Sequence, residues 1–117
     1  MHELSIIMEI LKIAEQNAQQ NNLKKIKKIK LKVGKLRHLV PDIMTVAFQT
    51  ARQDTLADQA KLEIEEIPIK MVCQNCQKKF MVEDHVYFCP KCQQGSLQIV
   101  TGKEIILESI EGEKNGD

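Results

Sequence analysis

The sequence predicts an α+β fold in which two helices pack on a small mixed β-sheet, with a cysteine-rich segment inserted before the last strands. Three observations indicate this arrangement: two stretches with apolar residues at helical spacing, several short alternating stretches, and a segment at 71–92 with little periodicity. The predicted order is helix, strand, helix, strand, insert, then one or two strands. Both helices are expected on one face of the sheet, because this buries one apolar side and leaves the other to water.

The first predicted helix occupies the N-terminal twenty residues. Its apolar residues recur at i, i+3, i+4 and i+7, and charged or amide side chains fill the other positions. They are Leu4, Ile7, Met8, Leu11, Ala14 and Ala18. We therefore expect an amphipathic helix of roughly five turns. It should end in the polar stretch "QQNNLKK".

A strand and a second helix follow. Residues 28–33 alternate strictly between lysine and aliphatic side chains, which is typical of a half-buried strand, and Gly34 is expected to end it. Pro41 suits the first turn of a helix, and Asp42 is favourable near its N-terminus. The stripe of this helix predicted to be buried consists of Ile43, Val46, Ala47, Thr50 and Ala51.

The second half of the chain contains the remaining predicted strands. "KLEIEEIPI", residues 61–69, reads as a strand with Leu62 and Ile64 directed inward until Pro68 disturbs the pairing. After Gly95, "SLQIVTGKEIILESIEGE" again has strand-like composition, and the tail "EGEKNGD" is expected to be disordered.

Composition and charge exclude several classes of protein. Hydrophobic residues make up 43% of the chain and the formal net charge is +1, so no strong overall field attracts nucleic acid or membrane. No run of 18 apolar residues is present, and Glu3, Glu9 and Lys12 interrupt any signal-peptide core. We expect a cytoplasmic protein with no membrane partner and with reduced cysteines.

Seven lysines lie within residues 24–35. Such a stripe can neutralise phosphates, but the aromatic residues that stack on single strands are nearly absent. The glutamates of segment 63–66 can instead pair with Lys30 and Lys32 across the sheet. We therefore predict a solvated, cross-paired sheet face and no nucleic-acid partner.

Four cysteines form the strongest motif in the chain. "CQNC" and "CPKC" have the spacing C-x2-C, twelve residues, C-x2-C, and place Cys73, Cys76, Cys89 and Cys92. Two thiolates separated by two residues can both reach one ion from a tight turn, and two such turns complete the tetrahedron that zinc accepts. The segment has too few apolar residues for a core of its own, so metal binding must supply most of its folding free energy. This predicts an inserted zinc-ribbon module.

Two alternatives to zinc stay open: a pair of disulfides, which requires an oxidising compartment, and a rubredoxin-like iron site. With four thiolates and no open position, a zinc site here would be structural and not catalytic. His85 lies within the module and is expected to be a solvated loop residue. The predicted domains are an α/β domain of residues 1–69 together with 97–117, and a zinc-ribbon insert of residues 70–96.

The chain opens "MHE", and these residues can form a second metal site. The amine of Met1, the backbone nitrogen of His2 and its ring nitrogen can form fused chelate rings around one ion. Ni(II) favours tetragonal or square-planar nitrogen and oxygen ligands. Glu3 can add a carboxylate or orient the imidazole. The competing interpretation is that Glu3 merely suits the start of a helix and that His2 is there by chance.

As a whole the chain resembles the HypA/HybF family, the nickel chaperones of [NiFe]-hydrogenase maturation. The resemblance rests on "MHELS", "VGKL", "DTLADQAKLEIEEIP", "CQNC", "CPKC" and a closing strand. It implies nickel binding by His2, Glu3 and the Met1 amine, and structural zinc at the four cysteines. Many relatives have glutamate where this chain has Lys35, so Lys35 is assigned no role. His38 is the best spare imidazole, although a loop position is the simpler interpretation.

The resemblance implies a nickel metallochaperone and not an enzyme. The chain is expected to bind Ni(II) at its N-terminus and to deliver it with a maturation GTPase of the HypB type to a hydrogenase large subunit, or in some lineages to urease. Its state is expected to be a monomer or a homodimer. The alternative is a zinc-ribbon adaptor that binds protein or RNA and has no nickel role.

Overall fold

The computed structural model describes residues 2–83, 86–93 and 95–114, apart from the side chain of His2. Its elements in chain order are α1 (His2–Gln20), β1 (Leu23–Gly34), the 3-10 helix η1 (Lys35–Arg37), α2 (Pro41–Ala51), β2 (Lys61–Ile67), β3 (Lys70–Cys73), β4 (Lys79–Met81), β5 (Leu97–Thr101) and β6 (Ile105–Lys114). The chain divides into two compact units. Unit 1 comprises residues 1–32, 39–65 and 106–117, and unit 2 comprises 33–38 and 66–105. The predicted domain boundaries, at 69/70 and 96/97, stay a prediction.

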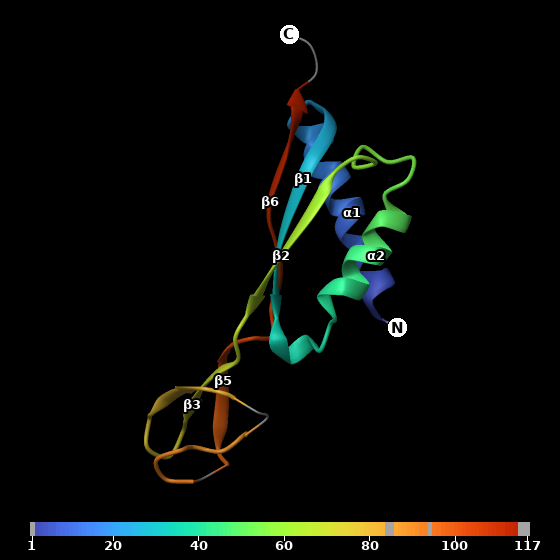
Figure 1. The fold of residues 1–117 in the computed structure, drawn as a ribbon. Helices are drawn as coiled ribbons and strands as arrows, with labels where there is room; N and C mark the ends of the chain where they lie inside the picture. The colour runs from blue at the N-terminus through green and yellow to red at the C-terminus, as the bar shows by residue number, and fades with distance from the viewer. Residues whose placement is uncertain (1, 84–85, 94, 115–117) are drawn as a thin grey trace. The chain divides into compact units, whose positions relative to one another are not determined.

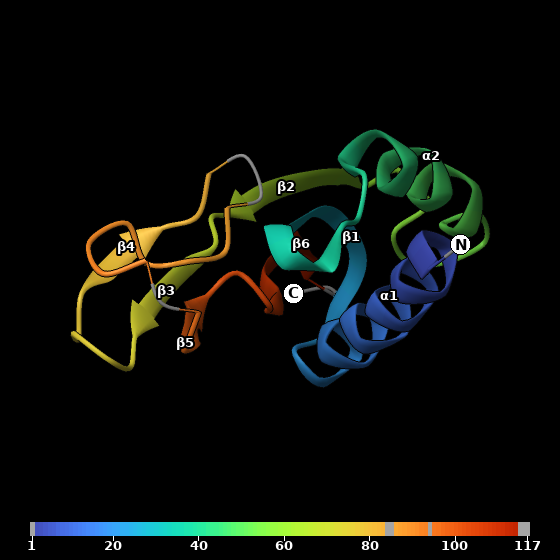
Figure 2. The ribbon, with the colours of Figure 1, turned by 90° about the horizontal axis from the view of Figure 1, so that it is seen from below.

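Unit 1 is a layer of two helices on a three-stranded sheet. The strand order is β2-β1-β6, and β6 runs opposite to the other two strands, so the sheet is mixed (Figure 1). The helices α1 and α2 contact each other and lie on the same side of this sheet (Figure 2). The predicted fold class is confirmed.

The core of unit 1 is aliphatic apart from Phe48. Its buried side chains are Ile7, Ile10, Leu11, Ala14, Ala18, Ile26, Ile29, Leu31, Met44, Phe48, Ala57 and Ala60. In α1 the predicted buried positions Leu4 and Met8 are wrong, since they are 45% and 58% exposed, and Ile10 is buried instead. The buried stripe therefore consists of Ile7, Ile10, Leu11, Ala14 and Ala18.

The face of α2 that was predicted to be buried is also wrong. Met44 and Phe48 are the buried residues, whereas Ile43 is 44% and Val46 62% exposed. Helical spacing allows two apolar stripes in this helix, because Ile43, Val46 and Thr50 repeat as regularly as Met44 and Phe48 do. The larger side chains face the sheet and α1, since filling that space requires their volume.

The ends of both helices follow from local chemistry. Asn22 has φ 58°, the left-handed conformation that commonly ends helices, and its N–H donates to the Gln19 carbonyl at 3.2 Å. Pro41 is in the first turn of α2, where its missing N–H costs nothing. The predicted end of α1 and the predicted start of α2 are confirmed.

Strand β1 is longer than predicted and contains an irregularity. It begins at Leu23, and its buried residues are Ile26, then Ile29 and Leu31. The change from an even to an odd position means that the alternation is interrupted between Ile26 and Ile29. The sequence alternates strictly only after that point, which explains why the predicted strand was short.

The exposed face of the unit 1 sheet is covered by lysine–glutamate pairs. Lys28 pairs with Glu63 of β2, but the other partners lie on β6, which differs from the predicted pairing with β2 alone. The β6 pairs are Lys27–Glu113 at 2.8 Å, Lys28–Glu111 at 3.7 Å, Lys30–Glu108 at 3.4 Å and Lys32–Glu108 at 3.2 Å. The lysines of this face do pair with glutamates of neighbouring strands, as predicted, although most of these glutamates lie on β6 and not on β2.

Unit 2 is an antiparallel three-stranded sheet with the order β4-β3-β5. Met71 pairs with Phe80 of β4 and with Ile99 of β5, and Cys73 pairs with Leu97. The ladder between β3 and β5 shifts register between Lys70 and Met71. The buried hydrophobic residues of unit 2 are few: Val33, Ile69, Met71, Cys73 and Cys89. A sheet with so small a core needs another source of stability.

Unit 2 also contains a tight turn between β5 and β6, residues Gly102–Glu104, which we call the β5–β6 turn. This turn forms hydrogen bonds with the segment Gly34–Arg37. Each of its three carbonyls accepts one hydrogen bond. Glu104 accepts from Gly34 N–H at 2.7 Å, Gly102 from Leu36 N–H at 2.8 Å, and Lys103 from Arg37 Nε at 2.7 Å. The backbone of this segment is therefore fixed to unit 2.

The C-terminal strand extends into the tail that was expected to be disordered. Strand β6 reaches Lys114, so this expectation is wrong for residues 111–114, because pairing with β1 and the Lys27–Glu113 ion pair order them. Residues 115–117 lie outside the described part. Among the described residues, no helix has the length and apolar character needed to cross a membrane.

Candidate metal centre

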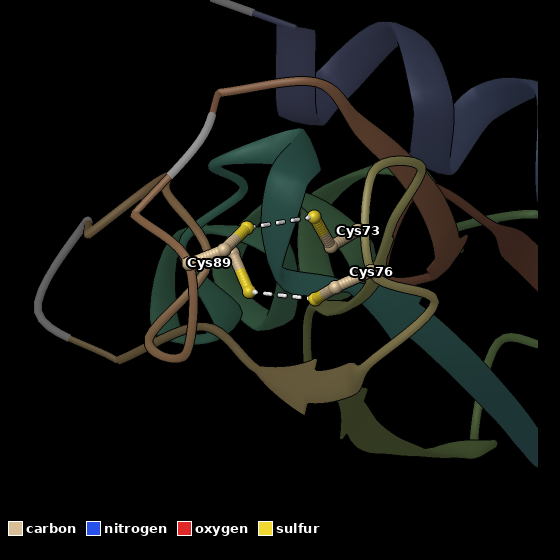
Figure 3. Close-up of side chains that lie close together, drawn as sticks. Cys73, Cys76 and Cys89 are labelled. Carbon is tan, nitrogen blue, oxygen red and sulfur yellow. Dashed lines mark hydrogen bonds between the residues drawn. The ribbon is translucent and has the colours of Figure 1, made fainter.

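The two cysteine knuckles of unit 2 bring four thiols together. Cys73 ends β3, Cys76 follows in a turn, and the second pair, Cys89 and Cys92, lies in a matching turn. Figure 3 shows the thiols of Cys73, Cys76 and Cys89 pointing toward one another. All four Sγ atoms lie within 4.8 Å of each other, so the grouping predicted from the spacing is present.

The sulfur distances fit a tetrahedral metal. The Sγ atoms of Cys73 and Cys92 are 3.5 Å apart, and those of Cys76 and Cys89 are 3.6 Å apart. A regular tetrahedron with metal–sulfur bonds of about 2.3 Å has sulfur–sulfur edges of about 3.8 Å. A disulfide requires about 2.05 Å, and all four cysteines are free. The donor set therefore fits a thiolate-bound ion such as zinc and not a pair of disulfides.

Both knuckles have the same backbone geometry. Gln77 and Gln93, each directly after the second cysteine of a pair, have φ values of 65° and 60°. Their N–H groups donate to the carbonyls of Cys73 at 2.7 Å and of Cys89 at 2.8 Å. Each turn is thus closed by a residue in the left-handed conformation, which turns the chain so that both thiols face one point.

Backbone and side-chain donors surround the sulfurs. The Lys91 N–H donates to the Sγ of Cys89 at 3.4 Å, and Asn75 Nδ2 donates to the Sγ of Cys92 at 3.7 Å. Such donors stabilise negative charge on sulfur and orient the ligands. Cys73 and Cys89 are fully buried, so the cluster is partly shielded from water.

The thiols do not titrate alike. The amide of Cys92, helped by that of Lys91 and by neighbouring thiols, outweighs burial and lowers the pKa of Cys89 to about 6. The amide of Lys78 lowers the pKa of Cys76, but burial and the other three thiols outweigh it and raise that pKa to about 11. Of these two thiols, Cys89 therefore loses its proton first, and a bound cation must displace the proton of Cys76.

Of the predicted nickel ligands, the structure describes the side chain of Glu3 alone, in the first turn of α1. Met1 and the side chain of His2 are outside the described part, and the backbone of His2 is the first residue of the helix. The half-buried Glu3 accepts a hydrogen bond through Oε2 from the N–H of Val40 at 3.2 Å. Val40 is the N-cap of α2, so the start of one helix is held at the start of the other.

The other singled-out residues are located as follows. His38 ends η1 with φ 55°, and its side chain is exposed. Lys35 is exposed at the start of the same helix. His85 lies outside the described residues. Sequence reasoning missed Val40, Gln77 and Gln93, because each acts through its backbone, which leaves no mark on residue type.

The fold and the cysteine cluster define a class: a small α+β protein with a four-cysteine metal-binding module. Comparisons identify the family. A family model described as "Hydrogenase/urease nickel incorporation, metallochaperone, hypA" matches residues 1–112. The chain therefore belongs to the HypA family, whose members are metallochaperones for nickel incorporation.

Relatives match over the full length. A hydrogenase maturation factor HypA of Moorella thermoacetica is 40% identical over 114 residues, covering 97% of this chain and 100% of its own. One from Shewanella baltica is 32% identical and covers both chains completely. The solution structure of the Ni metallochaperone HypA from Helicobacter pylori has a TM-score of 0.73 and 26% identity, and covers 98% of this chain and 100% of its own.

Proposed function

We propose that the chain is a nickel metallochaperone that binds Ni(II) through the Met1 amine, His2 and Glu3 and delivers it for hydrogenase maturation, and in some settings for urease. Membership of the family over residues 1–112 carries this proposal. The position of Glu3 supports it, because a carboxylate held by the Val40 amide is oriented at the chain terminus before an ion arrives.

The nickel site is proposed to be open and exchangeable. Ligands at a chain terminus can leave one at a time, which allows an ion to pass to a partner, whereas a closed cage would retain it. Ni(II) is thus cargo, and the chain performs no reaction on it. We accordingly do not expect an enzymatic activity.

Zinc is proposed as the resident ion of the second unit. Cys73, Cys76, Cys89 and Cys92 would hold it, and their sulfur spacing and four-thiolate set support this. When bound, zinc would supply folding free energy that the small core of unit 2 lacks. Free thiols of this kind persist in a reducing compartment, so the proposed location is the cytoplasm.

A role in maturation implies maturation partners. We propose a GTPase of the HypB type and a hydrogenase large subunit as these partners, with the chain as a monomer or homodimer. No nucleic-acid or membrane partner is proposed, because four of the six lysines of β1, Lys27, Lys28, Lys30 and Lys32, pair with glutamates.

The test is a Ni(II) titration by calorimetry on zinc-loaded protein without a tag, with His2→Ala alongside. The expected result is one nickel ion per chain at micromolar affinity or tighter in the wild type and a loss of that binding in the variant. A tag placed before Met1 should abolish binding as well, because it removes the free amine. Equal weak binding in all three would contradict the proposal and favour the adaptor alternative.

Zinc is tested separately by metal analysis of the purified protein. One equivalent of zinc in colourless protein, lost in Cys89→Ser, supports the structural site. Red protein containing iron would contradict it.

A further inference from the structure

The side chain of Asn75 joins the two cysteine knuckles of unit 2. Asn75 is the third residue of the first knuckle, between Cys73 and Cys76. Its Nδ2 donates to the Sγ of Cys92, which belongs to the second knuckle, at 3.7 Å. The thiols of Cys73 and Cys76 point toward Cys89 of that second knuckle (Figure 3). The amide of Asn75 therefore reaches the cluster from the same turn that supplies two of its sulfurs.

The backbone on both sides of Asn75 is fixed by hydrogen bonds. The N–H of Gln74 donates to the Ser96 carbonyl at 2.8 Å. The N–H of Gln77 closes the turn onto the Cys73 carbonyl at 2.7 Å, and its Nε2 donates to the Gln74 carbonyl at 3.3 Å. Asparagine has only two side-chain torsion angles, so an amide on this backbone can occupy few positions. The donor is therefore aimed at the Cys92 sulfur by the turn itself.

The bond to Cys92 differs in origin from the backbone bond to Cys89. The Sγ of Cys89 accepts from the N–H of Lys91, a backbone group of its own knuckle, at 3.4 Å. A backbone donor of this kind is present whichever residue occupies the position. The donor from Asn75 is set by residue type, and Asn75 is exposed, so its removal leaves no cavity in the core. Its contribution can therefore be removed without disturbing the rest of the module.

This hydrogen bond is expected to strengthen when a metal is bound. Cysteine binds a metal as the thiolate, and a hydrogen bond to a charged acceptor is roughly twice as strong as one between neutral groups. The asparagine NH2 group is a donor at every pH, because it has no proton that titrates. The side chain of Asn75 thus favours the metal-bound cluster over the free thiols. It also orients the sulfur of Cys92, as partners of metal ligands do.

We propose that Asn75 is a positioning residue of the four-cysteine metal site: its side-chain amide orients the Cys92 thiolate and stabilises the negative charge on that sulfur. The inference rests on the proposed zinc site and deepens it. It gives the first knuckle a part in holding a ligand of the second, in addition to the two ligands that it supplies itself.

The experiment compares Asn75→Ala and Asn75→Asp with the wild type in the full-length protein, and competition with a chelator measures zinc affinity. Aspartate has nearly the shape of asparagine, but its carboxylate cannot donate and adds a negative charge beside the sulfur. The matched controls are Gln74→Ala and Gln74→Glu. The hydrogen bonds of Gln74 given above use its backbone N–H and carbonyl, which both control variants keep.

We expect zinc affinity to fall by about tenfold in Asn75→Ala, the lower end of what partners of metal ligands contribute. Asn75→Asp should bind zinc more weakly still, because its carboxylate repels the thiolates. Both Gln74 variants should stay within about twofold of the wild type, as exposed substitutions generally do. A purely steric role of Asn75 would instead leave Asn75→Asp with the affinity of the wild type.

A second measurement detects the bond in the wild type and does not depend on how the variants fold. When a magnetic isotope of cadmium replaces zinc, NMR can detect a scalar coupling that passes from the metal through sulfur to a hydrogen-bonded proton. We expect this coupling at the side-chain NH2 group of Asn75. Its absence would overturn the inference.

Wild-type zinc affinity in either Asn75 variant would also overturn the inference, while zinc bound by the wild type would leave the proposed zinc site standing. An equal loss of affinity in Gln74→Ala would overturn it as well, because the turn as a whole and not the Asn75 amide would then be responsible. If the wild type binds no zinc, the proposed zinc site fails, and the inference fails with it.

Discussion

A side chain on Gly34 would overlap the carbonyl group of Gly102. A Cβ built there would also lie 2.7 Å from the Lys103 nitrogen, closer than real Cβ contacts. The atoms it meets belong to the backbone of the β5–β6 turn, which cannot rotate away as a side chain can. The close approach lets the Gly34 N–H reach the Glu104 carbonyl at 2.7 Å. Only glycine permits this packing.

We predict that Gly34→Ala destabilises unit 2 by about 2 kcal/mol or more, because the turn or the segment must move to admit the methyl group. Urea unfolding of zinc-loaded protein measures the change. Gly95→Ala is the control, since a Cβ there meets nothing within 4 Å, and it should change the free energy of unfolding little. Equal stability of Gly34→Ala and wild type would contradict this prediction and show that the β5–β6 turn moves to admit the methyl group at little cost in free energy.

The sequence patterns predicted where helices and strands lie along the chain better than which face of each is buried. The ends of α1 and α2 were predictable because Asn22 and Pro41 act locally through their own backbone preferences. The buried face of α2 was not, because the helix has two apolar stripes and only the space beneath it decides between them. The partners of the β1 lysines were similarly hidden, since the neighbouring position of β6 is a property of the topology.

The face of α2 provides a second prediction. Met44→Ala should lower the free energy of unfolding by about 2–5 kcal/mol, because it leaves a cavity in the core. Val46→Ala in the same helix should change it by less than about 0.5 kcal/mol, since Val46 is 62% exposed. Chemical denaturation of both variants measures the difference. The reverse order of effects would restore the face first predicted from the sequence.

The sequence predicted the ligands of the candidate sites but not the backbone groups that hold them in place. The cysteine spacing alone was enough to group the four thiols, because the metal-binding turn demands that spacing. The closing role of Gln77 and Gln93 was not, since glutamine gives no hint of positive φ. The "MHE" start suggested nickel chemistry, but the Val40 amide that holds Glu3 comes from a residue 37 positions away.

The closing glutamines give a third prediction. In Gln93→Gly the left-handed conformation at φ 60° no longer strains a Cβ, which favours the knuckle by about 1–2 kcal/mol, partly offset by the entropy that glycine loses on folding. The net effect is an expected gain in zinc affinity on the order of threefold, measured by competition with a chelator. Gln98→Gly within β5 is the control and should weaken the module. A weaker zinc site in Gln93→Gly would show that the glutamine side chain contributes to the turn.

The last prediction concerns pH. Hydrogen bonds and attraction from Lys32, and then from Lys30, lower the pKa of Glu108 below its ordinary value of 4.5. A carboxyl group with a lowered folded-state pKa stabilises the fold above its unfolded pKa and loses that contribution as pH falls through the folded value. Glu108→Gln should therefore be less stable than wild type at neutral pH, and the difference should vanish in strong acid.

Urea unfolding at pH 7 and at pH 3, in low and high salt, measures this difference. High salt should reduce it at pH 7, because the pairs are exposed and screened. Glu9→Gln on α1 removes the same charge at an exposed position away from the sheet face and serves as the control. If Glu108→Gln and wild type lose stability in parallel from pH 7 to pH 3, the pairs of Glu108 with Lys30 and Lys32 add nothing to the stability of unit 1.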